Sequence, residues 1–401
     1  MIAKISKKAY KNMLCSTKGG HVVNNMTYRE FRFLLFFLPI FALKLMDITT
    51  DNRVLIVVSS GCFLLDIVGF FNEKMSRHQV VFLSLGVIFT ALLVITCGKQ
   101  GAFFSAIIIL SLYKINPKKR IYKWCFGVGL IFVGISAYIE RNGSYGIRYI
   151  NGVWTSIYKR SNILYIAFFA VVCLYLYMQK KNKIKKTQTL CIWVLGYLMY
   201  QYTGSRTGFF VLNILILMII ALSNKKIQQN YIVKILCVNS PLIGFLISFF
   251  GAYYYRKFPV LYTINSMLQG RLELGQRYLN QYNLRLFGQP IYENFSADNF
   301  WCLDSAYLDM LICYGIIFCL VWILLSRKVI QWLYEESRFL EVATIVGYSV
   351  YGISETFLPN GFLNMSIFLY AEYIFSCILI RKRGTYNGKN KNNCNVSSAV
   401  S

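Results

Sequence analysis

A chain of 401 residues that is 56% hydrophobic and 17% aromatic, with only six prolines, is too apolar to form a single soluble core. Its repeated apolar runs, long enough to cross about 30 Å of hydrocarbon at about 1.5 Å per residue, predict an all-helical, polytopic membrane protein. The net charge of +27 is expected to orient the chain against an anionic inner leaflet, so it does not predict a nucleic-acid partner.

Twelve apolar runs are predicted to cross the bilayer as helices. In chain order they are Phe31–Met46, Val54–Phe71, Val80–Cys97, Ala102–Leu112, Trp124–Tyr138, Ile163–Met178, Leu190–Tyr202, Phe209–Leu222, Ile232–Tyr253, Ala306–Leu325, Val342–Phe357 and Phe362–Ile380. The fourth and seventh runs are short for a full crossing, so each could instead be a re-entrant or broken helix. One membrane domain, residues 31–380, therefore makes up nearly the whole chain.

The basic residues indicate the orientation of this domain. Cytoplasmic loops normally carry the excess of Lys and Arg, and the chain satisfies this rule when both termini are cytoplasmic. Residues 1–30 then form a basic cytoplasmic tail, and residues 381–401, rich in Asn, Ser, Lys and Gly, form a disordered one. In the same topology residues 253–301 form a large external loop.

This external loop carries five basic residues where topology does not call for them, and they are Arg256, Lys257, Arg271, Arg277 and Arg285. An anionic ligand met at the outer membrane surface explains them better. A 4-3-4-3-4 spacing also places six residues on one arc of a helix: Leu268, Leu272, Gly275, Leu279, Tyr282 and Leu286. The helix is expected to lie flat at the interface, with its arginines on another arc, facing lipid headgroups or the top of the bundle.

Arg206 lies between two apolar runs on the predicted outer side, flanked by Gly204 and Gly208. The glycines permit close backbone approach, and a guanidinium group can bind phosphate through two hydrogen bonds, so a diphosphate at headgroup depth is a natural ligand. The alternative is a snorkelling arginine in a tight turn, in which Ser205 or Thr207 caps the next helix.

Arg277 and Gly288 are separated by ten residues within the external loop. The external arginines could bind an anionic lipid-linked sugar and stabilise the charge that develops on its leaving group. Ordinary binding to anionic lipid at the interface is the alternative interpretation.

Carboxylates on the predicted outer side are candidates for binding sugar hydroxyls or for removing a proton. Asp298, Asn299 and Asp304 precede the Ala306 run, where a helix cap is an equally simple role. Glu355 lies near the outer end of the eleventh run, followed by Asn360, and intramembrane carboxylates are functional candidates by default. A salt bridge from Glu355 to an outer arginine is the alternative, and such a pair could also position that arginine.

The segments Thr203–Phe210, Asp298–Gly315 and Ser354–Asn360, together with the Arg277-x10-Gly288 spacing, resemble the Wzy-type polysaccharide polymerases, relatives of the O-antigen ligases. The resemblance covers most of the chain. It implies a glycosyltransferase of the GT-C type in a bacterial plasma membrane, which uses neither a metal ion nor another cofactor. The implied substrate is an undecaprenyl-diphosphate-linked oligosaccharide, whose repeat units are joined at the outer face with inversion. A flippase and a chain-length regulator are the implied protein partners.

The resemblance also implies roles for individual residues. Arg206 and Arg277 are expected to bind the diphosphate, with support from Arg271 and Arg285, while Asp298, Asp304 and Glu355 remain alternatives for the base. Ser205, Gly288, Asn299 and Asn360 are expected to contribute to substrate binding. The sister ligases use an external histidine, and both histidines here, His21 and His78, are predicted to be cytoplasmic, which favours a polymerase.

A flippase or other transporter of lipid-linked oligosaccharide is the competing function. It would also use many spans, and Asp66 and Lys44 could then line its pathway. The sequence shows no two-fold internal similarity, and alternating access does not need the long arginine-bearing loop. A membrane acyltransferase is disfavoured, because neither histidine has a suitable neighbour.

Overall fold

The computed structural model describes residues 27–45, 77–112, 115, 120–141, 148–150, 153–155, 161–179, 184–268, 270–293 and 302–376. Within these ranges the chain is a helical bundle, apart from an antiparallel hairpin of β1 (Arg148–Ile150) and β2 (Val153–Thr155). The predicted all-helical fold class is confirmed. The second predicted span, Val54–Phe71, and both predicted tails apart from residues 27–30 lie outside the described residues.

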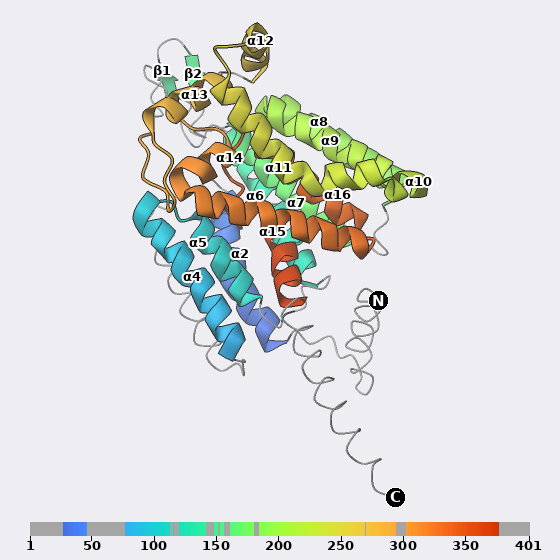
Figure 1. The fold of residues 1–401 in the computed structure, drawn as a ribbon. Coiled ribbons are helices and arrows are strands. Elements are labelled where there is room, and N and C mark those ends of the chain that lie inside the picture. Colours follow the sequence, from blue (N-terminus) through green and yellow to red (C-terminus); the bar gives the residue numbers. More distant parts are fainter. Residues whose placement is uncertain are drawn as a thin grey trace, which may run out of the picture.

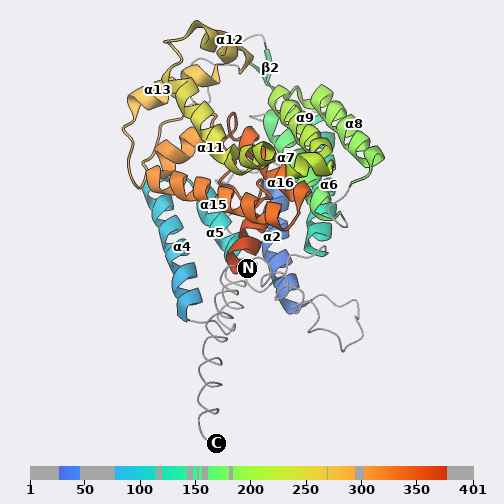
Figure 2. The same ribbon diagram turned by 45° about the vertical axis from the view of Figure 1, so that its right-hand side comes forward.

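Ten long helices form the bundle: α2 (Tyr28–Leu45), α4 (Arg77–Cys97), α5 (Gly101–Ser111), α6 (Arg120–Arg141), α7 (Ser161–Tyr177), α8 (Lys186–Thr203), α9 (Arg206–Ala221), α11 (Tyr231–Tyr253), α15 (Ile316–Glu335) and α16 (Phe339–Tyr351). Shorter elements are α10 (Lys225–Gln229), α12 (Pro259–Met267), α13 (Arg271–Gln281), α14 (Ala306–Asp309), the π-helical turn η2 (Met310–Tyr314) and a last helix at Ile367–Ser376. In Figures 1 and 2, α4 and α5 lie on one side, α8 and α9 lie on the other, and α15 crosses between them.

The helices have the composition of membrane-embedded elements. Three of those described are long and apolar enough to cross a bilayer, namely α11, α15 and the part of α6 from Arg120 to Tyr138. Large apolar side chains on the outer surface remain uncovered by protein, such as Ile95, Leu130 and Leu198. A bilayer would cover this apolar surface, which is consistent with a helical membrane protein.

Stacked aromatic rings hold the centre of the bundle together. Phe33, Phe37 and Phe41 repeat every four residues on one face of α2, and their ring centroids are 5.3 and 5.2 Å apart. The rings of Phe362 and Phe368 pack against Phe37 at 5.3 and 5.4 Å. The first and last described helices are therefore neighbours, which brings the loop after α16 into the bundle.

The predicted span Ala306–Leu325 is wrong as a single helix. It is divided into α14, the π-helical turn η2 and α15, with the break at Gly315, whose φ is +95°. The cause lies in the loop after α13, since the Ile316 amide donates to the Arg285 carbonyl at 3.0 Å and the Gln289 amide donates to the Cys313 carbonyl at 2.9 Å. Backbone groups of a segment distant in sequence thus form hydrogen bonds in place of those that a continuous helix would make.

The predicted interfacial helix from Leu268 to Leu286 is also corrected. Of the described residues between Leu268 and Leu286, only those of α13 are helical. Helix α13 ends at Gln281, because the backbone of Tyr282 is extended. Leu272 and Gly275 are buried, and Gly275 lies against Ala252 of α11 and Leu308 of α14. The apolar face of α13 therefore packs on the bundle rather than on lipid.

The last two predicted spans differ from expectation where they approach each other. Helix α16 ends at Tyr351 instead of Phe357, and the final helix begins at Ile367 instead of Phe362 and is described as far as Ser376. The segment between them, residues 352–366, folds as buried turns. The count of twelve spans and the GT-C architecture remain predictions.

Gly288 and Gly315 are both required to be glycine where the loop after α13 meets α15. Each has a positive φ, +77° and +95°, and a Cβ on either one would run into the backbone of the facing segment. Gly288→Ala and Gly315→Ala should each lower the free energy of unfolding by more than about 1 kcal/mol, the cost of left-handed backbone alone. Thermal unfolding of the detergent-purified protein measures this effect.

Gly86→Ala is the matched control for these two substitutions. Gly86 lies within α4, and nothing is within 4 Å of the position that its Cβ would take. Alanine should leave the stability unchanged or raise it, because alanine favours helix. Equal effects of all three substitutions would show that the contact between the two segments does not constrain the fold.

Candidate functional site

Arg271, the first residue of α13, is buried at the end of the bundle that the sequence predicts to be external. Its side chain is only 8% exposed. One terminal nitrogen donates to Glu355 Oε1 at 2.9 Å, the other donates to Thr207 Oγ1 at 3.2 Å, and Nε lies 3.8 Å from Asp304 Oδ2. Arg271 was expected to face lipid headgroups or the top of the bundle, and it is buried because two carboxylates compensate its charge there.

Glu355 is the carboxylate on which this arrangement centres. Its Oε1 accepts hydrogen bonds from Arg271 and from Asn162 Nδ2 of α7, the latter at 2.8 Å. The Glu355 carbonyl also accepts a hydrogen bond from the Ala306 amide at 3.1 Å, at the start of α14. The salt-bridge interpretation of Glu355 is therefore confirmed, with Arg271 as its partner, while a role of Glu355 in catalysis stays a prediction.

Arg206 begins α9 directly beside this cluster. Gly204 ends α8 with a φ of +67°, and the Ser205 hydroxyl caps α9 by accepting a hydrogen bond from the Gly208 amide at 3.3 Å. Ser205 is therefore a buried capping residue, as the alternative interpretation held, and it is not accessible for the expected substrate binding. The Arg206 side chain is exposed, while Thr207, the next residue, contacts Arg271.

The other expected arginines occupy different surroundings. Arg277 is 44% exposed and pairs with Glu273, one helical turn earlier on α13, at 2.6 Å. Arg285 is exposed, and its carbonyl group accepts a hydrogen bond at the start of α15. Gly288 lies where two backbone segments pack closely, as described above. Its positive φ and this close packing explain why the residue is glycine, without a role in substrate binding. Asp298 and Asn299 lie outside the described residues.

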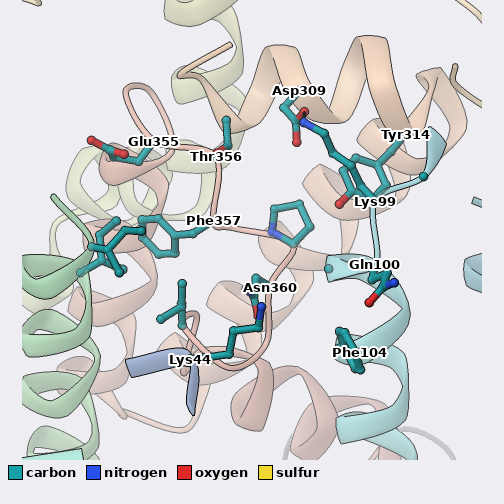
Figure 3. A pocket seen from close by; sticks show the side chains of 16 residues that line it. Lys44, Lys99, Gln100, Phe104, Asp309, Tyr314, Glu355, Thr356, Phe357 and Asn360 are labelled. Atoms are coloured by element: carbon teal, nitrogen blue, oxygen red, sulfur yellow. Dashed lines mark hydrogen bonds and ion pairs between the residues drawn. The ribbon is translucent and has the colours of Figure 1, made fainter. Parts of the chain in front are cut away.

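A cavity of about 400 Å³ lies beside the Arg271 cluster, and Figure 3 shows it from close by. Residues from α2, α5, α7, α14, the η2 turn and the loop 352–366 line it, together with the turn between α4 and α5. Glu355 belongs both to its wall and to the Arg271 ion pair. Asn360 also lines it, and its Oδ1 accepts a hydrogen bond from the Phe362 amide at 3.1 Å.

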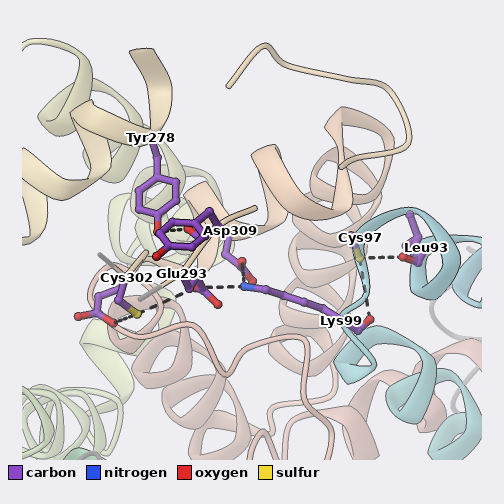
Figure 4. Close-up of polar contacts among 9 residues, drawn as sticks. Leu93, Cys97, Lys99, Tyr278, Glu293, Cys302 and Asp309 are labelled. Atoms are coloured by element: carbon purple, nitrogen blue, oxygen red, sulfur yellow. Dashed lines mark hydrogen bonds and ion pairs between the residues drawn. The ribbon is translucent and has the colours of Figure 1, made fainter. Parts of the chain in front are cut away.

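The cavity contains an ion pair that the sequence analysis did not identify. Lys99 Nζ lies 2.7 Å from Asp309 Oδ1 and 3.5 Å from Glu293 Oε1, as Figure 4 shows. Burial lowers the pKa of Lys99, but its neighbours together, first among them the Asp309 carboxylate, outweigh burial and hold the pKa well above its ordinary value. Lys99 is therefore a permanently charged part of the wall.

A signal for this pair was present in the sequence. Asp309 is a carboxylate inside a predicted span, and such a residue is a functional candidate by default. Lys99 lies in the short turn between two predicted spans, on the side where basic residues are not expected. Their pairing was not foreseen because 210 residues separate them along the chain.

The two ion pairs of α13 provide a test of the role of burial. Glu355→Ala leaves Arg271 without its closest carboxylate in a buried site, which should lower the free energy of unfolding by about 3–5 kcal/mol. Glu273→Ala removes a carboxylate from the exposed Arg277 and should cost no more than about 0.5 kcal/mol. Thermal unfolding of both variants in the same detergent gives the comparison. Similar losses would mean that Glu355 does not stabilise a buried charge.

Comparison with known proteins gave no relative from which an activity could be transferred. No protein-family model, curated protein or solved structure matches this chain. The resemblance to the Wzy-type polymerases therefore rests on the residues of the chain itself.

Proposed function

We propose that this protein is a Wzy-type polysaccharide polymerase, which joins lipid-linked oligosaccharide repeat units at the outer face of a bacterial plasma membrane. The observation that carries the proposal is the arrangement around Arg271. A buried guanidinium group held by Glu355, Asp304 and Thr207 lies next to the exposed Arg206 and beside a cavity with polar walls. A prenyl-diphosphate sugar needs a cationic site for its phosphates and an adjacent space for its sugar.

In the proposed reaction, a hydroxyl oxygen of one repeat unit attacks the anomeric carbon of the growing chain. The bond from that carbon to the diphosphate oxygen breaks, the electron pair leaves with the diphosphate, and the hydroxyl proton passes to a carboxylate. Arg206 and Arg271 stabilise the negative charge that develops on the leaving group. Two guanidinium groups meet this requirement, so the proposal includes no metal ion.

The surroundings of the candidate carboxylates favour Asp304 as the proton acceptor. Glu355 Oε1 is already occupied by two donors, Asn162 and Arg271. The Asp304 side chain is 21% exposed; its Oδ1 accepts a weak hydrogen bond from the Cys302 thiol at 3.4 Å, and its Oδ2 is 3.8 Å from Arg271 Nε, so Oδ2 is the less occupied oxygen. In this assignment Glu355 is a positioning residue that fixes Arg271.

The proposal places both termini in the cytoplasm and the Arg271 cluster outside. A flippase would supply the lipid-linked repeat units, and a chain-length regulator would be a second partner in the membrane. The convergence of predicted external segments on one end of the bundle supports this orientation.

Arg206→Ala should abolish long surface polymer while the protein remains inserted in the membrane, because the leaving group loses its exposed guanidinium ligand. Arg206→Lys should rescue poorly, since an ammonium group cannot form the two parallel hydrogen bonds. Electrophoresis of the surface glycan from a complemented deletion strain gives the measurement. Lys226→Ala changes an exposed basic residue on α10, outside the predicted ligand-binding loop, and is the control. Normal polymer ladders in Arg206→Ala would contradict the assignment.

The location of the accumulated intermediate separates the polymerase from the competing flippase. In a deletion strain, a missing polymerase leaves single lipid-linked repeat units on the outer face of the membrane. A missing flippase leaves them on the inner face. Accessibility of these units to an added glycosidase in intact spheroplasts should be high, and protection from the enzyme would favour the flippase.

A further inference from the structure

We propose that the cavity beside Arg271 is a binding site for one neutral sugar ring, with the Lys99 and Asp309 pair forming part of its polar edge. The source of that ring, the lipid-linked repeat unit, rests on the proposed function. The site itself rests on the composition, the charge balance and the construction of the cavity walls.

The size of the cavity fits a small polar ligand. Its volume of about 400 Å³ is within the range of roughly 300–1,000 Å³ that is usual for small-molecule sites. Gly98 and Gln100, which are exposed, form part of its lining, so the cavity reaches the surface at the turn between α4 and α5.

The charges in the wall favour a neutral ligand. Lys99 is paired with Asp309 at 2.7 Å, and Glu355 is paired with Arg271 at 2.9 Å. Lys44, the third cation of the lining, also has an interaction partner. A buried carboxylate on the ligand would meet Asp309 and Glu355 and would be repelled. Hydroxyl groups can instead donate to these carboxylates and accept from the ammonium group, without adding a charge to the site.

The remaining lining residues suit the two faces of a sugar ring. Gln100, Thr356 and Asn360 supply neutral donors and acceptors, while the rings of Phe104 and Phe357 supply apolar surface for carbon-bound hydrogens. Figure 3 shows Asp309 and Lys99 on one side of the cavity, with Lys44 beside Asn360 on another. A ring bound between these sides would find polar groups around its edge.

The π-helical turn η2 is what brings two of the lining residues together. Asp309 and Tyr314 are five residues apart, and in an α-helix of about 3.6 residues per turn they would point about 140° away from each other. The turn between them has i to i+5 hydrogen bonds, and both residues line the cavity. The irregular turn therefore has a consequence at the site, as π-helical turns commonly do.

The position of the cavity connects it to the proposed diphosphate site. Glu355 lines the cavity and binds Arg271, so one side chain separates a bound ring from the buried guanidinium group. The first sugar of a prenyl diphosphate is bonded directly to its phosphate, and the attacking sugar must come within bonding distance of the same carbon. Either ring could therefore occupy the cavity.

Direct binding tests the proposal without requiring activity. The full chain in nanodiscs is titrated with a panel of neutral methyl glycosides, of hexoses and of N-acetylhexosamines, and with methyl glucuronide, and binding is followed by saturation-transfer NMR. At least one neutral glycoside should bind, and the glucuronide should bind more weakly. Gln100→Trp, which fills the cavity from its exposed rim, should weaken binding by at least about tenfold.

Gln201→Trp is the matched control, because Gln201 is exposed in the last turn of α8 and does not line the cavity. It should bind as the wild type does. Thr356→Trp fills the cavity from another side chain and should reproduce the loss, in case Gln100→Trp does not fold. Unchanged binding in a folded cavity-filling variant, tighter binding of the glucuronide, or no binding of any glycoside to the wild type would overturn the proposal.

The same variants separate this proposal from the polymerase. If glycosides bind in the cavity but a deletion strain still makes normal polymer, the sugar site stands and the polymerase proposal fails. If Arg206→Ala abolishes polymer while Gln100→Trp leaves both polymer and glycoside binding unchanged, the polymerase stands and the cavity proposal fails.

Discussion

A buried positive charge organises one end of this molecule. Removing a guanidinium group from water costs several kcal/mol unless carboxylates and hydrogen bonds compensate it. Arg271 meets this condition through Glu355, Thr207 and Asp304, which belong to three different parts of the chain. The requirement to compensate one charge therefore fixes α13, the start of α9 and the loop after α16 relative to one another.

The apolar runs predicted the helices well. A segment in a membrane must satisfy its own backbone hydrogen bonds, so a sufficiently long apolar run is expected to be helical from its composition alone. Helices α4, α6, α7 and α11 lie close to their predicted ranges. The break at Gly315 could not be predicted in this way. It depends on Arg285 and Gln289, whose backbone groups reach α15 only after the chain has folded.

The sequence predicted which residues belong to the candidate site better than it predicted how they are arranged. The sequence indicated Arg206, Arg271, Asp304 and Glu355, and the structure brings the last three into one cluster beside the first. It did not indicate that Arg271 points inward, because periodicity on α13 says nothing about a carboxylate 84 residues later. Lys99 and Asp309 were missed for the same reason.

The order in which the chain is synthesised gives the Arg271 and Glu355 pair a consequence for membrane insertion. Arg271 emerges from the ribosome 84 residues before its partner, and Lys99 emerges 210 residues before Asp309. An unpartnered cation cannot be dehydrated at low cost, so each side chain must stay hydrated until its carboxylate arrives. The end of the molecule that holds Arg271 is therefore completed only when the segment after α16 has been delivered, and a nascent chain shorter than this has no assembled site.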